Sequence, residues 1–107
     1  MESYKKPYLT YTVNCLGTLN ILERVKNNNI INSLVCITSD KCYESNNSIK
    51  GFKETDKLGS EDPYSGSKAS AEIMIGTYQK SFFNRKKCGI ASARARNVIG
   101  GGDWSEN

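Results

Sequence analysis

Two short motifs in this chain carry residue types suited to proton transfer. Ser39, Asp40 and Lys41 stand together directly after an apolar run, and Tyr64 precedes Lys68 by four residues. Residues four apart on a helix share one face. Tyrosine is a poor base at neutral pH, but a neighbouring ammonium group favours the phenolate form. The pair is therefore suited to removing a proton from a sugar hydroxyl while hydride leaves the same carbon.

The location of Ser39 at the end of a predicted strand strengthens this interpretation, although each motif also has an ordinary explanation. Ser39 follows the apolar run 34–38, which is typical of a buried strand, and ligands of open α/β sheets bind at the carboxyl ends of strands. Its hydroxyl would reach the same sugar oxygen as Tyr64, with an acid and an amine beside it. Alone, Ser39-Asp40 would be interpreted as the start of a turn, and Tyr64 and Lys68 as common helix neighbours.

The elements that must position these residues alternate along the chain. The patterns predict helices over 7–26 and 63–83 and strands over 34–38 and 90–93. Asp62 is the predicted N-cap of the second helix, with Pro63 at its first position. Helix, strand, helix and strand in this order predict right-handed crossovers and a parallel sheet with helices on both faces. The fold class is therefore α/β, a partial Rossmann-like doubly wound sheet.

Three local features add expectations about this fold. Gly17 lies in mid-helix, where it costs about 1 kcal/mol relative to alanine, so we expect another backbone to approach it closely. The polar loop 40–62 is long for a compact domain, and such loops are usually functional. Two strands leave edges and faces that need cover. We therefore expect residues 1–107 to be a single partial domain, the central part of something larger.

Charge and hydropathy exclude several classes of protein. The net charge is +4 over 107 residues, and the basic residues are dispersed apart from the cluster 85–87, which we interpret as a solvated helix end. No nucleic-acid partner is therefore expected. No apolar run approaches the roughly 18 residues of a membrane span, and the amino terminus lacks the apolar stretch of a secretory signal. We expect a cytoplasmic protein without membrane contact.

The cysteines do not indicate a metal site. The four cysteines lack metal-ligand spacing, and the chain contains no histidine. Cys15 and Cys36 lie in apolar patterns, so we expect both to be small core residues. Free thiols in a cytosolic protein are the simplest account of all four.

Taken together, the motifs resemble those of the extended short-chain dehydrogenase/reductase family, in particular its nucleotide-sugar 4,6-dehydratases. The resemblance covers nearly the whole chain and rests on the segments 12–18, 38–44, 58–69 and 97–104. Ser39-Asp40-Lys41 and the terminal Gly-Gly-Gly-Asp-Trp favour enzymes that act on CDP-glucose. The related enzymes that act on dTDP-glucose have Thr-Asp-Glu in place of Ser39-Asp40-Lys41.

The resemblance implies an NAD-dependent lyase reaction in three steps. Tyr64, helped by Lys68 and Ser39, would oxidise C4 of the glucose with tightly held NAD. Water would then be lost across C5 and C6, with Asp40 as the acid for the C6 hydroxyl and Lys41 assisting removal of the C5 proton. Hydride would finally return to C6, giving a 4-keto-6-deoxy sugar. Tyr64 and Lys68 would also contact the cofactor, with Lys68 donating to its ribose hydroxyls.

The same resemblance implies supporting residues and a partner. Asn97 would contact the substrate, with Ser39 also on the substrate side. Asn14 would support the site from the first helix, directly or through a water. The alternative for Asn14 is a helix asparagine whose hydrogen bonds are satisfied locally. The two long helices resemble those that form a four-helix homodimer interface in the family.

Three departures from the family pattern bear on activity. The glycine-rich turn that holds the cofactor pyrophosphate is absent from these residues, as is the carboxyl-terminal region that grips the nucleotide-sugar. Arg96 also stands where the family usually has glycine, so it would either block the pocket or contact phosphate. We therefore expect residues 1–107 to be inactive alone. The alternatives are another family member, such as a sugar epimerase, and a non-catalytic remnant that associates through Leu16, Leu19, Ile73 and Tyr78.

Overall fold

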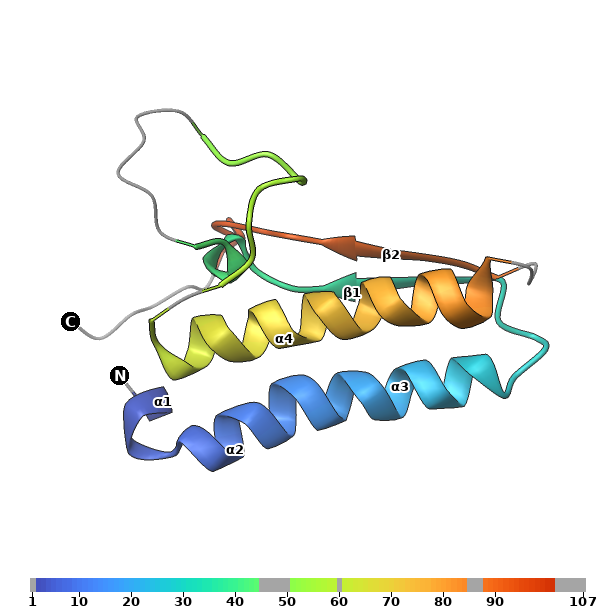
Figure 1. Ribbon diagram of the computed structural model, residues 1–107, viewed down its shortest axis with the longest axis horizontal. Helices are drawn as coiled ribbons and strands as arrows, with labels where there is room; N and C mark the ends of the chain where they lie inside the picture. Colours follow the sequence, from blue (N-terminus) through green and yellow to red (C-terminus); the bar gives the residue numbers. More distant parts are fainter. Residues whose placement is uncertain (1, 45–50, 60, 85–87, 102–107) are drawn as a thin grey trace.

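The structure is a computed structural model that describes residues 2–44, 51–59, 61–84 and 88–101 (Figure 1). Two predicted features therefore lie outside the described residues. They are the basic cluster 85–87 and the end of the glycine-rich motif from residue 102 onward.

The first long helix runs from Pro7 to Lys26, as the sequence predicts, but its winding changes midway. It comprises α2 (Pro7–Tyr11), a π-helical turn (Thr12–Leu16) and α3 (Gly17–Lys26), preceded by a short helix, α1 (Glu2–Lys5), that the sequence analysis did not anticipate. A π-helical turn inserts one extra residue and so rotates the side chains beyond it; such turns are frequent at functional sites.

The second long helix begins at its predicted cap. The Asp62 carboxylate accepts hydrogen bonds from the backbone N–H groups of Tyr64 (3.0 Å) and Ser65 (3.1 Å), which are donors that the first helical turn leaves unpaired. Helix α4 (Pro63–Tyr78) follows and continues into a π-helical turn (Gln79–Phe83). The predicted start and extent of this helix are both confirmed.

The two strands form a parallel pair, as predicted. Strand β1 (Ser33–Ile37) pairs with β2 (Gly89–Ala93) in a register that opposes Ser33 to Gly89 and Ile37 to Ala93. Backbone pairing continues past both strands, because the Asp40 N–H donates to the Ala95 carbonyl at 3.1 Å. The carboxyl end of β1 is therefore held by its neighbour as far as Asp40.

The main core lies between the helices and one face of this pair. Its buried members come from α3, α4 and β2 and the turns beside them: Leu22, Val25, Ile75, Phe83, Cys88 and Ile90. In Figure 1, α3 and α4 lie on the same side of the strands, with α4 nearer to them. A second, smaller cluster of Cys42, Tyr43 and Ala69 packs the segment after β1 against α4.

The expectation of cover on both faces of the strands is wrong for the described residues. Val35 and Ile37 are 60% and 64% exposed, because alternate side chains of a strand point to opposite faces and the described helices cover one face. Strand β1 is therefore half-buried rather than enclosed.

Two further expectations about packing need correction. Nothing among the described residues lies within 4 Å of a Cβ built on Gly17, so no backbone approaches it; the glycine instead lines an open pocket. Cys15 and Cys36 are only half-buried, whereas Cys42 and Cys88 are the buried cysteines. Cys36 packs against the main core but also lines the open pocket, so it stays partly exposed. All four thiols are free, as expected.

Candidate active site

Tyr64 and Lys68 share one face of the first turns of α4. The Lys68 ammonium lies 5.8 Å from the centre of the Tyr64 ring, within the range of a cation–π contact. Tyr64 is 36% exposed and Lys68 is half-buried. The predicted pair is therefore brought together on the helix, with the phenol accessible to a ligand.

Asn14 contacts α4 directly through its side chain. Its side-chain amide donates to the Ser67 hydroxyl at 2.8 Å, and that hydroxyl donates to the Tyr64 carbonyl at 2.6 Å. Ser67 is fully buried. Asn14 lies within the π-helical turn Thr12–Leu16, so the change of winding and this bond to α4 occur at the same place. The contact runs through a protein hydroxyl and requires no water.

A second contact between the two helices involves a glycine that the sequence analysis did not single out. A Cβ built on Gly66 would lie 2.6 Å from the Tyr11 hydroxyl oxygen, closer than non-bonded atoms approach. Gly66 lies two residues from both Tyr64 and Lys68 and therefore points away from their face of the helix. The absence of a side chain at Gly66 leaves room for the Tyr11 hydroxyl against α4.

The Ser39-Asp40-Lys41 segment lies in a turn at the end of β1. Ser39 is 7% exposed and caps a 3₁₀ turn over Asp40–Cys42, where its hydroxyl accepts a hydrogen bond from the Lys41 N–H at 3.2 Å. Asp40 is half-buried and Lys41 is exposed. The turn interpretation of this motif is thus correct locally. The Asp40 carboxylate also accepts a hydrogen bond from the Ser39 hydroxyl at 3.5 Å and lies beside Arg96.

This segment packs against the same helix that carries Tyr64 and Lys68. Cys42 is fully buried in the small cluster that includes Ala69, the residue after Lys68. The strand-end motif and the helix motif are therefore held on neighbouring elements.

A pocket of about 340 Å³ opens beside Lys68. Its lining includes Asn14, Gly17, Val35, Ile37 and Lys68. Ser39, Asp40 and Tyr64 do not line it. The pocket therefore lies between the first long helix, residues 34–37 along β1 and the Lys68 ammonium, and it does not include the whole set of predicted residues.

Arg96 contacts Asp40. Its Nε lies 3.7 Å from the Asp40 Oδ2, and the Arg96 side chain is 84% exposed. The sequence left open whether this arginine would block the pocket or contact phosphate; in the structure it forms an exposed ion pair with the predicted acid. Asn97, the predicted substrate contact, is exposed.

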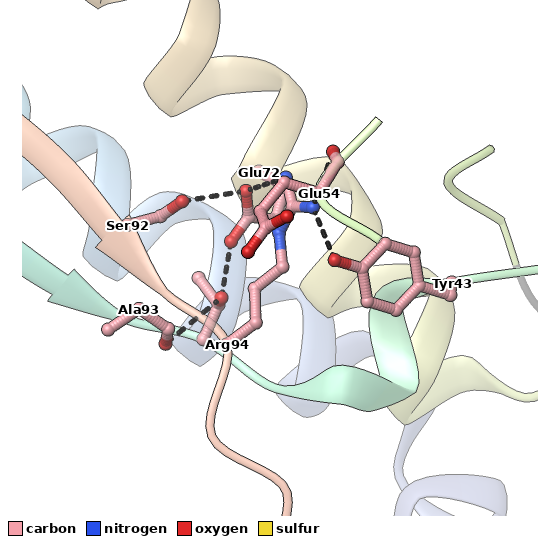
Figure 2. A network of polar contacts seen from close by, with 7 residues as sticks. Tyr43, Glu54, Glu72, Ser92, Ala93 and Arg94 are labelled. Atoms are coloured by element: carbon pink, nitrogen blue, oxygen red, sulfur yellow. Dashed lines mark hydrogen bonds and ion pairs between the residues drawn. The ribbon is translucent and has the colours of Figure 1, made fainter. Parts of the chain in front are cut away.

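A buried polar network lies between these elements, and sequence reasoning missed it (Figure 2). The Glu72 carboxylate accepts hydrogen bonds from the Thr38 hydroxyl, from the Ser92 hydroxyl at 2.9 Å and from Arg94 Nη2 at 2.7 Å. Arg94 Nη1 also donates to the Tyr43 hydroxyl at 2.7 Å and to the carbonyl of Glu54 at 3.0 Å.

Charge in this network is strongly compensated. Burial raises the pKa of Glu72, but the hydrogen bonds from Arg94, Thr38 and Ser92 outweigh it and leave that pKa below its ordinary value. The hydrogen bond to Glu72 raises the pKa of Arg94. The pair is therefore ionised throughout the physiological range. The sequence signal that could have indicated this network was the position of Glu72, one helical turn after Lys68 on the same face of the helix.

Comparison with known proteins identifies the class. The sequence model of the family described as GDP-mannose 4,6 dehydratase matches residues 1–95. The chain belongs to this family.

Two individual relatives of this chain are glucose 4,6-dehydratases that act on nucleotide-sugars. The chain is 44% identical over 110 residues to CDP-glucose 4,6-dehydratase of Salmonella typhimurium, a match that covers 98% of this chain and 31% of the relative. It is 32% identical over 115 residues to dTDP-D-glucose 4,6-dehydratase of Dictyostelium discoideum, covering 98% of this chain and 25% of the relative. The chain thus spans less than a third of the length of these relatives.

Solved structures agree on the fold. A dTDP-glucose 4,6-dehydratase from Bacillus anthracis in complex with NAD is 33% identical with a TM-score of 0.65, over 77% of this chain and 25% of that one. A UDP-N-acetylglucosamine 4-epimerase from Methanobrevibacter ruminantium, in complex with UDP-N-acetylmuramic acid, has a TM-score of 0.74 at 24% identity, over 87% of this chain and 28% of that one. The fold is therefore part of a Rossmann-like α/β domain, as predicted.

Other kinds of site were sought in the described ranges. Among residues 2–44, 51–59, 61–84 and 88–101, no three histidine, cysteine, aspartate or glutamate side chains gather as a metal site would require. Within the same ranges, no helix has the length and hydropathy needed to cross a membrane.

Proposed function

We propose that this chain is the catalytic segment of a nucleotide-sugar 4,6-dehydratase that converts CDP-glucose to CDP-4-keto-6-deoxyglucose. The observation that carries the proposal is the packing of the Ser39-Asp40-Lys41 turn against the helix that holds Tyr64 and Lys68. The identity of 44% to the Salmonella typhimurium CDP-glucose enzyme supports CDP over other nucleotides.

In this proposal Tyr64 removes the proton of the C4 hydroxyl. The Lys68 ammonium lies on the same helix face, 5.8 Å from the centre of the Tyr64 ring, and the Ser39 hydroxyl hydrogen-bonds the C4 oxygen. Loss of the C4 hydroxyl proton together with a hydride from C4, which bound NAD would accept and later return to C6, gives a ketone that makes the C5 proton acidic. Lys41 assists its removal, and Asp40 donates a proton to the departing C6 hydroxyl, which leaves as water.

Part of the expected cofactor site fits the residues present. The chemistry that bound NAD supplies is reversible hydride acceptance. Tyr64 is accessible, and Lys68 lies on an open pocket with Asn14, so a ribose with hydroxyl acceptors would find a donor there. Residues 1–107 contain no glycine-rich pyrophosphate turn, and the fit therefore concerns the ribose end of the cofactor. The solved Bacillus anthracis relative contains NAD.

Asp40 and Lys41 favour a dehydratase over a sugar epimerase. Epimerisation at C4 needs only the oxidation and reduction steps, whereas loss of water requires an acid at C6 and a base at C5. An acid–amine pair beside the serine meets this requirement. The four free thiols also suit a cytoplasmic enzyme, since disulfides are rare in that compartment.

A second candidate function is association between copies of this chain. Leu16 and Ile73 are 50% and 60% exposed on the two long helices, and apolar side chains exposed on neighbouring helices are typical of a helix-mediated interface. We propose a homodimer through these helices, with Leu19 and Tyr78 at its edge. Sedimentation of the protein with Leu16→Glu and Ile73→Glu should give monomers; an unchanged dimer would contradict this interface.

The ion pair between Arg96 and Asp40 leads to a prediction about rate. Arg96 Nε lies 3.7 Å from the Asp40 oxygen that would face the C6 hydroxyl, so it competes with that hydroxyl for the carboxyl group. Exposed pairs of this kind are worth about 0–1 kcal/mol. Replacing Arg96 by glycine should therefore raise kcat by up to about five-fold, with KM unchanged. A rise in KM instead would assign Arg96 to the substrate phosphates.

The proposed function is tested on the full-length protein, the product of the complete coding sequence that contains residues 1–107. Incubated with NAD, it should convert CDP-glucose to a product lighter by one water, which mass spectrometry detects. Turnover of dTDP-glucose and GDP-mannose should be slower. Equal or faster turnover of another nucleotide-sugar would overturn the choice of CDP, and epimerised product without loss of water would overturn the dehydratase assignment.

A further inference from the structure

Glu72 and Arg94 have no part in the chemistry proposed above, yet they form the most deeply buried charged pair among the described residues. The Glu72 side chain is 3% exposed and that of Arg94 is 19% exposed, with 2.7 Å between Nη2 and Oε2. Removing one member of a buried ion pair leaves the other charge uncompensated. We therefore expect this buried pair to stabilise the arrangement of the segments that it connects.

The pair connects both ends of the strand-end motif to one point on α4. Thr38, the residue before Ser39, donates its hydroxyl proton to Glu72. Tyr43, the residue after the 3₁₀ turn, is bonded to Arg94, which is itself bonded to Glu72. The segment Ser39–Cys42 is therefore anchored on both sides.

The anchor point lies on the helix that carries the other half of the site. Glu72 is one turn beyond Lys68 and two turns beyond Tyr64 on α4, so a rigid helix links it to both side chains. Figure 2 shows the arginine reaching from the end of β2 toward Glu72 on one side and Tyr43 on the other. The Arg94 guanidinium also lies 5.0 Å from the centre of the Tyr43 ring, which stacks on Phe52 at 4.8 Å.

On the basis of the proposed function, we propose that Glu72 and Arg94 are positioning residues of the dehydratase. They hold Ser39, Asp40 and Lys41 at a fixed place relative to Tyr64 and Lys68. Geometry of this kind has a large effect on rate, because a displacement of about 1 Å at the reacting groups can cost about 10²-fold. The two halves of the site come from segments far apart in the chain, and this network is the polar connection between them.

The test removes the hydrogen bond between Arg94 and the Tyr43 hydroxyl and leaves the ion pair intact. Glu72→Gln would leave the Arg94 charge buried without its partner and is expected to impair folding. Tyr43→Phe removes only the hydroxyl that Arg94 contacts and keeps the ring stacked on Phe52. In the full-length protein with NAD, Tyr43→Phe should lower kcat for CDP-glucose about ten-fold, leave KM and the affinity for NAD unchanged, and increase release of the 4-keto sugar that has not lost water.

A matched control lies at the far end of the same helix. Thr77 donates its hydroxyl proton to the Ile73 carbonyl at 2.9 Å, so Thr77→Val also removes one side-chain hydrogen bond but lies outside the site. It should keep the kcat of the unmodified protein. Thr38→Val supplies an independent variant on the other side of the segment. Combined with Tyr43→Phe, it should lower kcat by less than the product of the two separate effects, because both act on one segment.

The outcomes separate the two proposals. If the unmodified protein dehydrates CDP-glucose and Tyr43→Phe turns over as fast as Thr77→Val, the positioning role is wrong while the proposed function stands. If Tyr43→Phe and Thr77→Val both lose rate in proportion to lost stability, the network is structural and the positioning role is also wrong. If the unmodified protein releases no dehydrated product, the proposed function fails, and the positioning role fails with it.

Discussion

Replacing Tyr64 by phenylalanine should reduce turnover of the full-length protein by about 10²- to 10⁴-fold, the range that a positioned acid–base group contributes. Tyr64 is the proposed base for the C4 hydroxyl, and phenylalanine keeps the ring while removing the group that accepts the proton. The ring lies at the accessible start of α4, and the Asp62 cap that fixes this turn uses backbone groups. The fold should therefore persist.

The measurement is kcat for loss of water from CDP-glucose, combined with the dissociation constant of NAD by fluorescence titration. NAD binding should remain largely intact, because Lys68 stays in place. Tyr8→Phe is the matched control, since Tyr8 is 84% exposed, and it should retain full turnover. Retained turnover in Tyr64→Phe would contradict the role of Tyr64.

Replacing Asp40 by asparagine should separate oxidation from loss of water. The amide keeps the size of the side chain but cannot donate a proton to the departing C6 hydroxyl. We expect formation of the 4-keto-6-deoxy product to fall about 10²- to 10⁴-fold, while oxidation at C4 continues because Tyr64 and Lys68 are untouched.

This separation is visible in the products. Rapid quenching followed by mass spectrometry should reveal a 4-keto sugar that retains its C6 hydroxyl. Asp56→Asn is the control, because the Asp56 carboxylate accepts a hydrogen bond from the Lys53 N–H at 2.8 Å and an amide oxygen can do the same. Loss of oxidation and of dehydration to the same extent in Asp40→Asn would contradict the assignment of Asp40 as the acid of the second step.

The local elements of this fold were predictable from the sequence because their signals are local. The Asp62-Pro63 start of α4, the extent of the first long helix and the parallel pairing of β1 with β2 follow from capping residues, hydrophobic period and element order. The spacing of Tyr64 and Lys68 likewise fixes their shared face. The structure agrees with each of these predictions.

Features that depend on partners distant in the sequence were not predictable. The exposure of Val35 and Ile37 depends on which elements cover β1, and an apolar run gives no information about this. The pairing of Glu72 with Arg94 joins residues 22 positions apart across two elements, and a lone glutamate on a helix is more often solvated than buried. The π-helical turn at Asn14 leaves no periodic signal.

The roles of the site residues remain predictions. The structure brings Lys68 beside Tyr64 and the Asp40 turn beside α4. The sequence left the position of the Arg96 side chain open. In the structure this side chain pairs with Asp40. What that pair does to the rate depends on the Arg96→Gly comparison.

The measurement that tests the central claim most directly follows a label through the reaction. The full-length protein is supplied with NAD and with CDP-glucose carrying deuterium at C4, and the product is examined by NMR. The account predicts a CDP-4-keto-6-deoxyglucose that has lost one water and carries the deuterium at C6. Deuterium retained at C4 of an epimerised sugar, or no loss of water, would contradict it.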